Sequence, residues 1–93
     1  MNALFKRKAL LNEIQTGLQD GSLSYGSAVA RLRQELTGLS AADFARQCGI
    51  GVRTLTQLEQ GSSTPTLATL DAVLRPFGLQ MGFIDSRPLK PGQ

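Results

Sequence analysis

The side chains that usually perform catalysis are scarce in this sequence. Its 93 residues include no histidine and one cysteine, Cys48. The absence of histidine excludes Ser-His and Cys-His nucleophile pairs and nearly every zinc site. The seven carboxylates form no close pair along the chain that would suggest a two-carboxylate active site. The sequence therefore predicts a protein that is not an enzyme and that uses no metal and no cofactor.

The charge balance is compatible with an acidic partner but does not by itself identify one. Ten basic residues against seven acidic ones give a net charge of +3, which suits a phosphate backbone or an acidic membrane. The longest apolar runs fall far below the roughly 20 residues that cross a bilayer, so no membrane contact is predicted. No apolar segment follows the basic residues 6–8, so no export signal is predicted. With a single cysteine and no internal disulfide, a cytoplasmic location is expected.

Apolar residues recur at helical spacing in five segments that glycine and proline separate. The first stripe is Leu4, Leu11, Ile14 and Leu18, and the helix that carries the first three of them is predicted over residues 3–16. Further helices are predicted from Tyr25 to Leu36 and over residues 41–48, 52–60 and 67–74. After Gly78 the period changes to two, which predicts a strand over residues 79–84.

The most informative spacing lies between residues 40 and 60. Ser40 and Asp43 resemble a capping box at the start of a short helix. Ala45 is small enough for a second helix to approach, and Gly49, four residues on, tolerates the positive φ of a sharp turn. Leu55 and Leu58 then face inward from the next helix. Two short helices crossing steeply at a glycine turn are typical of a helix-turn-helix.

In residues 38–50, 53–61 and 64–70 the sequence resembles the Cro and phage-repressor family of regulators, also called XRE-type. The resemblance implies an all-α, five-helix, phage-repressor-like helix-turn-helix fold. It also implies that the helix from Val52 to Gln60 enters the major groove of DNA. Residues 77–84 are similar to HipB-type antitoxins, in which a C-terminal β-strand pairs across a dimer. This narrower likeness implies a toxin–antitoxin operon and a kinase-like toxin as a protein partner.

The resemblance also implies which side chains touch DNA. Leu55 and Leu58 point inward, so the base-reading residues would be Val52, Arg53, Thr56 and Gln57. Arginine pairs bidentately with guanine and glutamine with adenine, while Val52 and the Thr56 methyl group suit thymine methyls. Hydroxyl and basic groups nearby suit phosphates, which fix register without reading sequence. The phosphate candidates are Ser40, Arg46, Thr54, Ser62, Ser63 and Thr64.

Two positions depart from the family pattern. The family usually carries a glutamine that braces the recognition helix and a phosphate, and this sequence has Ala41 in its place. The family often carries an arginine four residues before the glycine of the Gly-Leu-Ser run, paired with the glutamate that corresponds to Glu59. Here that position holds Gln34, and Arg33 lies one residue earlier. Either the preceding helix is wound differently, or Glu59 has another partner.

The predicted strand points to a homodimer. A lone strand leaves backbone hydrogen-bonding groups unpaired, and antiparallel pairing with a second copy would satisfy them. The alternative is an irregular tail that folds back on the domain. The predicted dimer interface is Leu79, Gln80, Met81, Gly82, Phe83 and Ile84.

The domain assignment follows from these segments. Residues 1–24 form an accessory helix and linker, 25–78 the DNA-binding domain, 79–85 the dimerisation strand and 86–93 a flexible tail. The accessory helix could pack on the domain, extend the dimer or bind a protein partner. The predicted function is a dimeric repressor that binds double-stranded, pseudo-palindromic operator DNA, as a HipB-type antitoxin. The alternative is a protein-interaction module on a helix-turn-helix scaffold, with little affinity for DNA.

Overall fold

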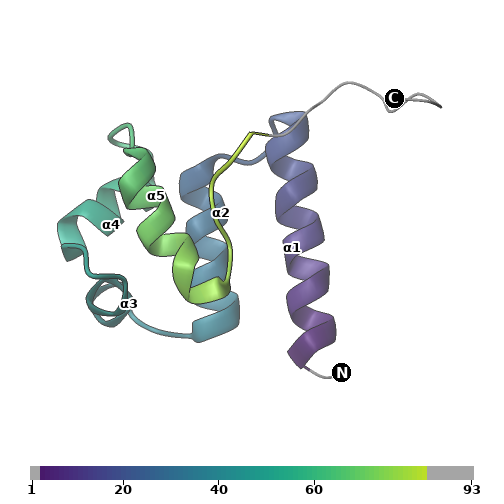
Figure 1. The fold of residues 1–93 in the computed structure, drawn as a ribbon, viewed down its shortest axis with the longest axis horizontal. Coiled ribbons are helices and arrows are strands. Elements are labelled where there is room, and N and C mark those ends of the chain that lie inside the picture. Colours follow the sequence, from purple (N-terminus) through teal and green to yellow (C-terminus); the bar gives the residue numbers. More distant parts are fainter. Residues whose placement is uncertain (1–2, 84–93) are drawn as a thin grey trace.

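The computed structural model describes residues 3–83, which fold as a small helical domain (Figure 1). Five α-helices account for most of it, with one π-helical and one 3₁₀ turn. None of the helices in this part of the chain is both long and apolar enough to cross a lipid bilayer. The elements are α1 (Ala3–Asp20), α2 (Tyr25–Leu32), the π turn η1 (Arg33–Thr37), α3 (Ala41–Cys48), α4 (Val52–Gln60), α5 (Leu67–Leu74) and the 3₁₀ turn η2 (Arg75–Phe77).

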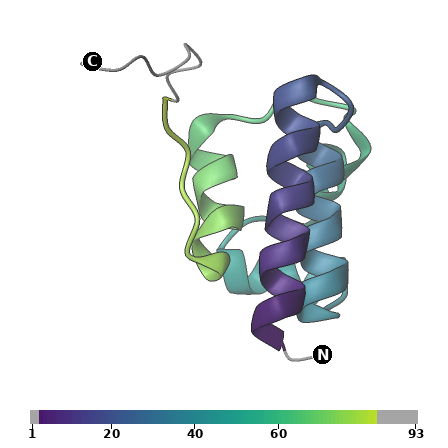
Figure 2. The same ribbon diagram turned by 90° about the vertical axis from the view of Figure 1, so that its right-hand side faces the viewer.

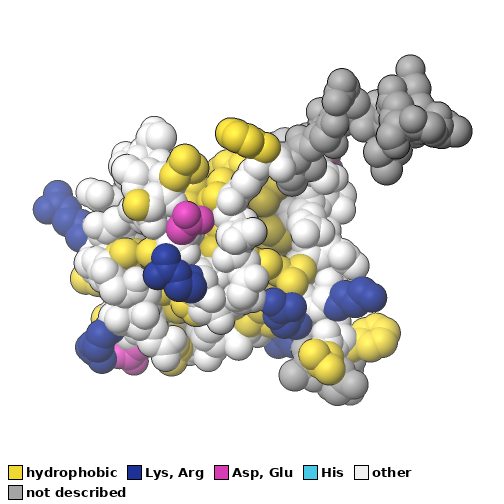
Figure 3. All heavy atoms as spheres, viewed as in Figure 1, with side chains coloured by type: hydrophobic (Ala, Val, Ile, Leu, Met, Phe, Trp, Pro, Cys, Tyr) yellow, Lys and Arg dark blue, Asp and Glu magenta, His cyan; other side chains and the backbone are white. Residues whose placement is uncertain are grey.

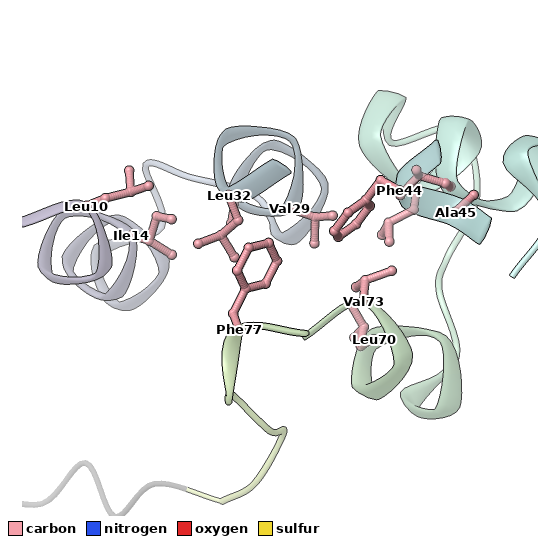
Figure 4. Close-up of a cluster of buried hydrophobic side chains, with 12 residues drawn as sticks. Leu10, Ile14, Val29, Leu32, Phe44, Ala45, Leu70, Val73 and Phe77 are labelled. Atoms are coloured by element: carbon pink, nitrogen blue, oxygen red, sulfur yellow. The ribbon is translucent and has the colours of Figure 1, made fainter. Parts of the chain in front are cut away.

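The helices enclose one hydrophobic core (Figure 4). Phe44, Leu55 and Val73 have no exposed surface, and together they join α3, α4 and α5. The ring of Phe77 lies 5.8 Å from that of Phe44, centroid to centroid, and closes the core from the C-terminal side. The all-α, five-helix fold predicted from the sequence is confirmed.

Helix α1 packs along α2, on the side away from α3 and α4 (Figures 1 and 2). Its buried side chains are Leu10 and Ile14. The predicted stripe was wrong at Leu4, whose side chain is 78% exposed, because the buried face runs through Leu10 instead. Arg7 also ties α1 to the domain, since its Nη2 donates to the Phe77 carbonyl at 2.6 Å. In this structure, therefore, the accessory helix packs on its own domain.

Two helix ends differ from the prediction. Helix α1 continues past Gly17 to Asp20, since Gly17 is buried against Leu23 and packs there without breaking the helix. The second helix was predicted to run to Leu36, but α2 ends at Leu32 and a π turn follows. Tyr25, predicted on the apolar face, begins α2 and is 50% exposed.

The predicted C-terminal strand is absent from residues 79–83. This segment extends from η2 and packs back on its own chain, where Leu79 and Met81 contact the core. The Leu79 N–H donates to the Leu74 carbonyl at 3.1 Å, and the Met81 N–H donates to an Asp71 carboxylate oxygen at 3.1 Å. A side chain of α5 thus takes the hydrogen bond that a second strand would have received. Gln80, Gly82 and Phe83 are exposed, whereas Ile84 and the predicted tail 86–93 lie outside the described residues.

Candidate nucleic-acid interface

The chain turns sharply between α3 and α4. Ser40 caps α3, its hydroxyl accepting the Asp43 N–H at 3.1 Å as the capping pattern predicted. At the other end Gly49 has a φ of 74°, and the Ile50 N–H returns to the Ala45 carbonyl at 3.0 Å. This pair of features is the Schellman arrangement that ends a helix and redirects the chain. A side chain at position 49 would strain that backbone, which is why the turn requires glycine.

One face of helix α4 is buried, and the opposite face is accessible to solvent. Leu55 and Leu58 are 0% and 2% exposed, so the inward face agrees with the sequence pattern. Val52 is 47% exposed, Arg53 is exposed, and Thr56 and Gln57 are half-buried. Val52 and Thr56, like Arg53 and Gln57, are four residues apart, so each pair shares a helix face. The four predicted base-reading side chains therefore lie together on the outer side of α4.

The buried side of α4 is held against α2 at Gly26. A Cβ atom built on Gly26 would lie 2.1 Å from the backbone oxygen of Leu58 and 3.2 Å from that of Glu59. Only glycine allows two helix backbones to approach this closely. This contact is not evident from the sequence, where its one signal is a glycine inside a helical pattern, which often marks close packing.

Glu59, near the C-terminal end of α4, pairs with Arg33. The Arg33 Nε and Nη2 atoms each lie 2.8 Å from a Glu59 carboxylate oxygen, and Nη1 donates to the Leu39 carbonyl at 2.9 Å. The two side chains are only 13% and 11% exposed. The hydrogen bonds that Arg33 donates to Glu59 raise the pKa of Arg33, against the opposing effect of burial. Of the two alternatives left by the sequence, the first holds: the helix before α3 is wound differently, in a π turn.

The predicted phosphate contacts surround α4 on several elements. Ser40 caps α3, Thr54 lies exposed in the first turn of α4, and the hydroxyl run 62–64 follows the other end of α4. Arg46 is 78% exposed, and its Nη1 lies 3.2 Å from an Asp43 oxygen. Ser62 donates its hydroxyl to the Gln57 carbonyl at 3.4 Å. All six candidates (Ser40, Arg46, Thr54, Ser62, Ser63 and Thr64) are exposed.

On the face drawn in Figure 3, lysine and arginine side chains are separated by other residues and form no continuous patch. Arg31 is occupied on the surface by Glu35 and Glu13, each at 2.8 Å, and these hydrogen bonds raise its pKa. On this face, therefore, the distribution of basic side chains does not by itself mark an interface.

Cys48 lies at the C-terminal end of α3, half-buried and packed against the core. Burial raises the pKa of its thiol, which keeps the sulfur protonated and poorly nucleophilic at neutral pH. The residue therefore acts as a small packing group. The residues that the structure describes contain no cluster of three metal-ligating side chains.

The turn between α3 and α4, together with the sequence around it, indicates the class of protein. Residues 29–84, more than half of the chain, match a helix-turn-helix family, and the chain belongs to that family, of the XRE type, whose members are DNA-binding transcriptional regulators.

Relatives among characterised proteins are distant. The HTH-type transcriptional regulators PuuR of Escherichia coli (strain K12) and of Shigella flexneri are each 29% identical to this chain over 76 residues. The match covers 82% of this chain but only 40% of each relative. No solved structure matches the chain significantly.

Proposed function

We propose that this protein is a transcriptional repressor that binds double-stranded operator DNA by placing α4 in the major groove. The observation that supports this most directly is the division of α4 into a sealed face at Leu55 and Leu58 and an exposed face at its N-terminal end. Arg53 would pair with a guanine and Gln57 with an adenine, and Val52 and Thr56 would contact thymine methyls. The hydroxyl and basic groups around α4 would fix its register on the phosphates.

A dimer would contact more base pairs than one copy of α4 can. A nine-residue helix is about 13 Å long, which spans only about four base pairs at roughly 3.4 Å each. Two copies bound to half-sites about 34 Å apart would read a pseudo-palindrome of useful specificity. The HipB-type antitoxin role depended on a C-terminal strand. Because residues 79–83 instead pack on α5, that role has lost its structural support and is not part of this proposal.

Arg53→Ala is expected to weaken binding to the preferred duplex by about 1–3 kcal/mol, or roughly fivefold to 150-fold, and to relax specificity at one base position. The preferred duplex would first be selected from a random-sequence pool, and affinities would be measured by gel shift at several stated salt concentrations. Arg75→Ala is the matched control, because Arg75 is also exposed and carries the same charge but lies on η2.

The competing interpretation, a protein-interaction module, gives a different result. It predicts no duplex selection and no salt-dependent DNA retention. Equal losses in Arg53→Ala and Arg75→Ala would show that net charge, and not the outer face of α4, causes the binding. Either result would contradict the proposal.

A further inference from the structure

The chain between Leu32 and Gly38 is wound as a π turn, with a hydrogen bond from the Gly38 N–H to the Arg33 carbonyl at 3.0 Å. A π turn bonds residue i to i+5, where an α-helix bonds i to i+4, so it accommodates one additional residue. We propose that this turn is a one-residue insertion that keeps Arg33 aimed at α4, and that Arg33 is a positioning residue for DNA binding. The DNA-binding part of this inference rests on the proposed function.

The guanidinium of Arg33 joins three parts of the domain. Two of its nitrogens hold the Glu59 carboxylate, near the C-terminal end of α4. A third nitrogen holds the Leu39 carbonyl, one residue before the cap of α3. One side chain on the π turn thus fixes both helices of the helix-turn-helix to the preceding element. Displacing it would tilt the outer face of α4 without removing any group that touches DNA.

The side chain of Thr37 stabilises the unusual winding. Its hydroxyl donates to the Arg33 carbonyl at 2.5 Å and accepts the Leu39 N–H at 3.0 Å. A threonine hydroxyl that bonds back along a helix competes with the regular backbone pattern and bends the chain. The Thr37 hydroxyl therefore bonds to backbone groups on both sides of the end of the turn, and Gly38 starts the connection to α3.

The insertion has a consequence that an ordinary helix lacks. Deleting one residue from an α-helix rotates everything on one side of the deletion by about 100°, which moves its buried face into solvent. Deleting Gln34, which is exposed, would instead let the π turn relax to an α turn, leaving Arg33 and Gly38 in place. Exchanging residues 33 and 34 would keep the chain length, composition and net charge but move the arginine to a position that faces solvent. The exchange would therefore remove the Arg33–Glu59 pair.

The test compares three variants with the parent protein: the Gln34 deletion, the exchange Arg33→Gln with Gln34→Arg, and deletion of exposed Gln15 in α1 as the control. The measurements are thermal unfolding, the Arg33 Nε–H resonance in ¹H–¹⁵N spectra, and affinity for the selected and an unrelated duplex. The Gln34 deletion is expected to unfold cooperatively, keep the Arg33 resonance and retain its affinity within about threefold, near the scatter of neutral surface changes. The Gln15 deletion should lower the thermal midpoint markedly.

The exchange variant is expected to bind the selected duplex about tenfold more weakly, the equivalent of one base contact, with unchanged affinity for the unrelated duplex. Loss of cooperative unfolding in the Gln34 deletion would show that the π turn is not a one-residue insertion. Full affinity of the exchange variant for the selected duplex would show that Arg33 does not position α4 for DNA binding. If the parent protein selects no duplex, the proposed function fails, while unfolding and the Arg33 resonance still decide whether the π turn is an insertion.

Discussion

Gly26→Ala is expected to destabilise the protein by about 2–3 kcal/mol, because the new methyl group overlaps the backbone of α4. The added Cβ would lie 2.1 Å from the Leu58 carbonyl oxygen, and a backbone atom cannot move aside as a flexible side chain can. Alanine is the better helix former by about 1 kcal/mol, so intrinsic propensity alone predicts the opposite sign. Urea unfolding followed by circular dichroism measures which effect is larger.

Gly82→Ala is the matched control for this substitution. A Cβ at Gly82 would meet nothing within 4 Å, so its effect should stay within about 0.5 kcal/mol. Under conditions in which the Gly26→Ala variant remains folded, the same displacement of α4 should weaken its binding to DNA. A variant as stable as the parent protein would mean that α2 and α4 do not approach as described.

Removing one member of the Arg33–Glu59 pair is expected to cost about 3 kcal/mol, whereas replacing both should cost less than either single change. Glu59→Leu leaves a mostly buried guanidinium with the Leu39 carbonyl as its remaining partner here. The double variant Arg33→Met, Glu59→Leu removes that unpaired charge and fills the space with apolar atoms. A double-mutant cycle from urea unfolding gives the coupling energy directly.

The surface pairs of Arg31 supply the comparison for this cycle. Arg31 and its partner Glu13 are 36% and 62% exposed, so solvent screens their attraction. Arg31→Met should therefore change the unfolding midpoint far less than Glu59→Leu. If the effects of Arg33→Met and Glu59→Leu were additive, and each as small as that of Arg31→Met, the buried pair would contribute no more to stability than a surface pair.

The sequence was a good guide where local chemistry decides the structure. Ser40 caps α3 through Asp43, and Gly49 ends it, because hydroxyl caps and left-handed glycines act over three or four residues. The inward positions of Leu55 and Leu58 follow from the period of a helix. Once the inward side is known, the outward side of α4 and its candidate base contacts follow.

Contacts between distant segments were harder to predict. The approach of Gly26 to Leu58 joins residues 32 positions apart, and the pattern of α2 alone does not reveal it. Arg33 on the π turn pairs with Glu59 on α4, and the pattern of residues 25–36 alone does not reveal the winding that makes this contact. The burial of Leu10 and the exposure of Leu4 likewise depend on how α1 packs against the rest of the domain, which the period of α1 alone does not reveal.

The C-terminal segment shows how a correct period can mislead. Leu79, Met81 and Phe83 alternate with polar or small neighbours, as a strand would require. In the structure this alternation turns Leu79 and Met81 to the core while Gln80, Gly82 and Phe83 are exposed, and Asp71 accepts the Met81 N–H. An extended segment lying on a helix has the same two-residue period as a strand.

Whether the outer face of α4 lies on the DNA is decided by amide chemical shifts measured while the protein is titrated with the selected duplex. The largest changes are expected at Val52, Arg53, Thr56 and Gln57, while the amides of α1 keep their positions. Changes concentrated on α1, or saturable binding that leaves α4 unchanged, would contradict that placement.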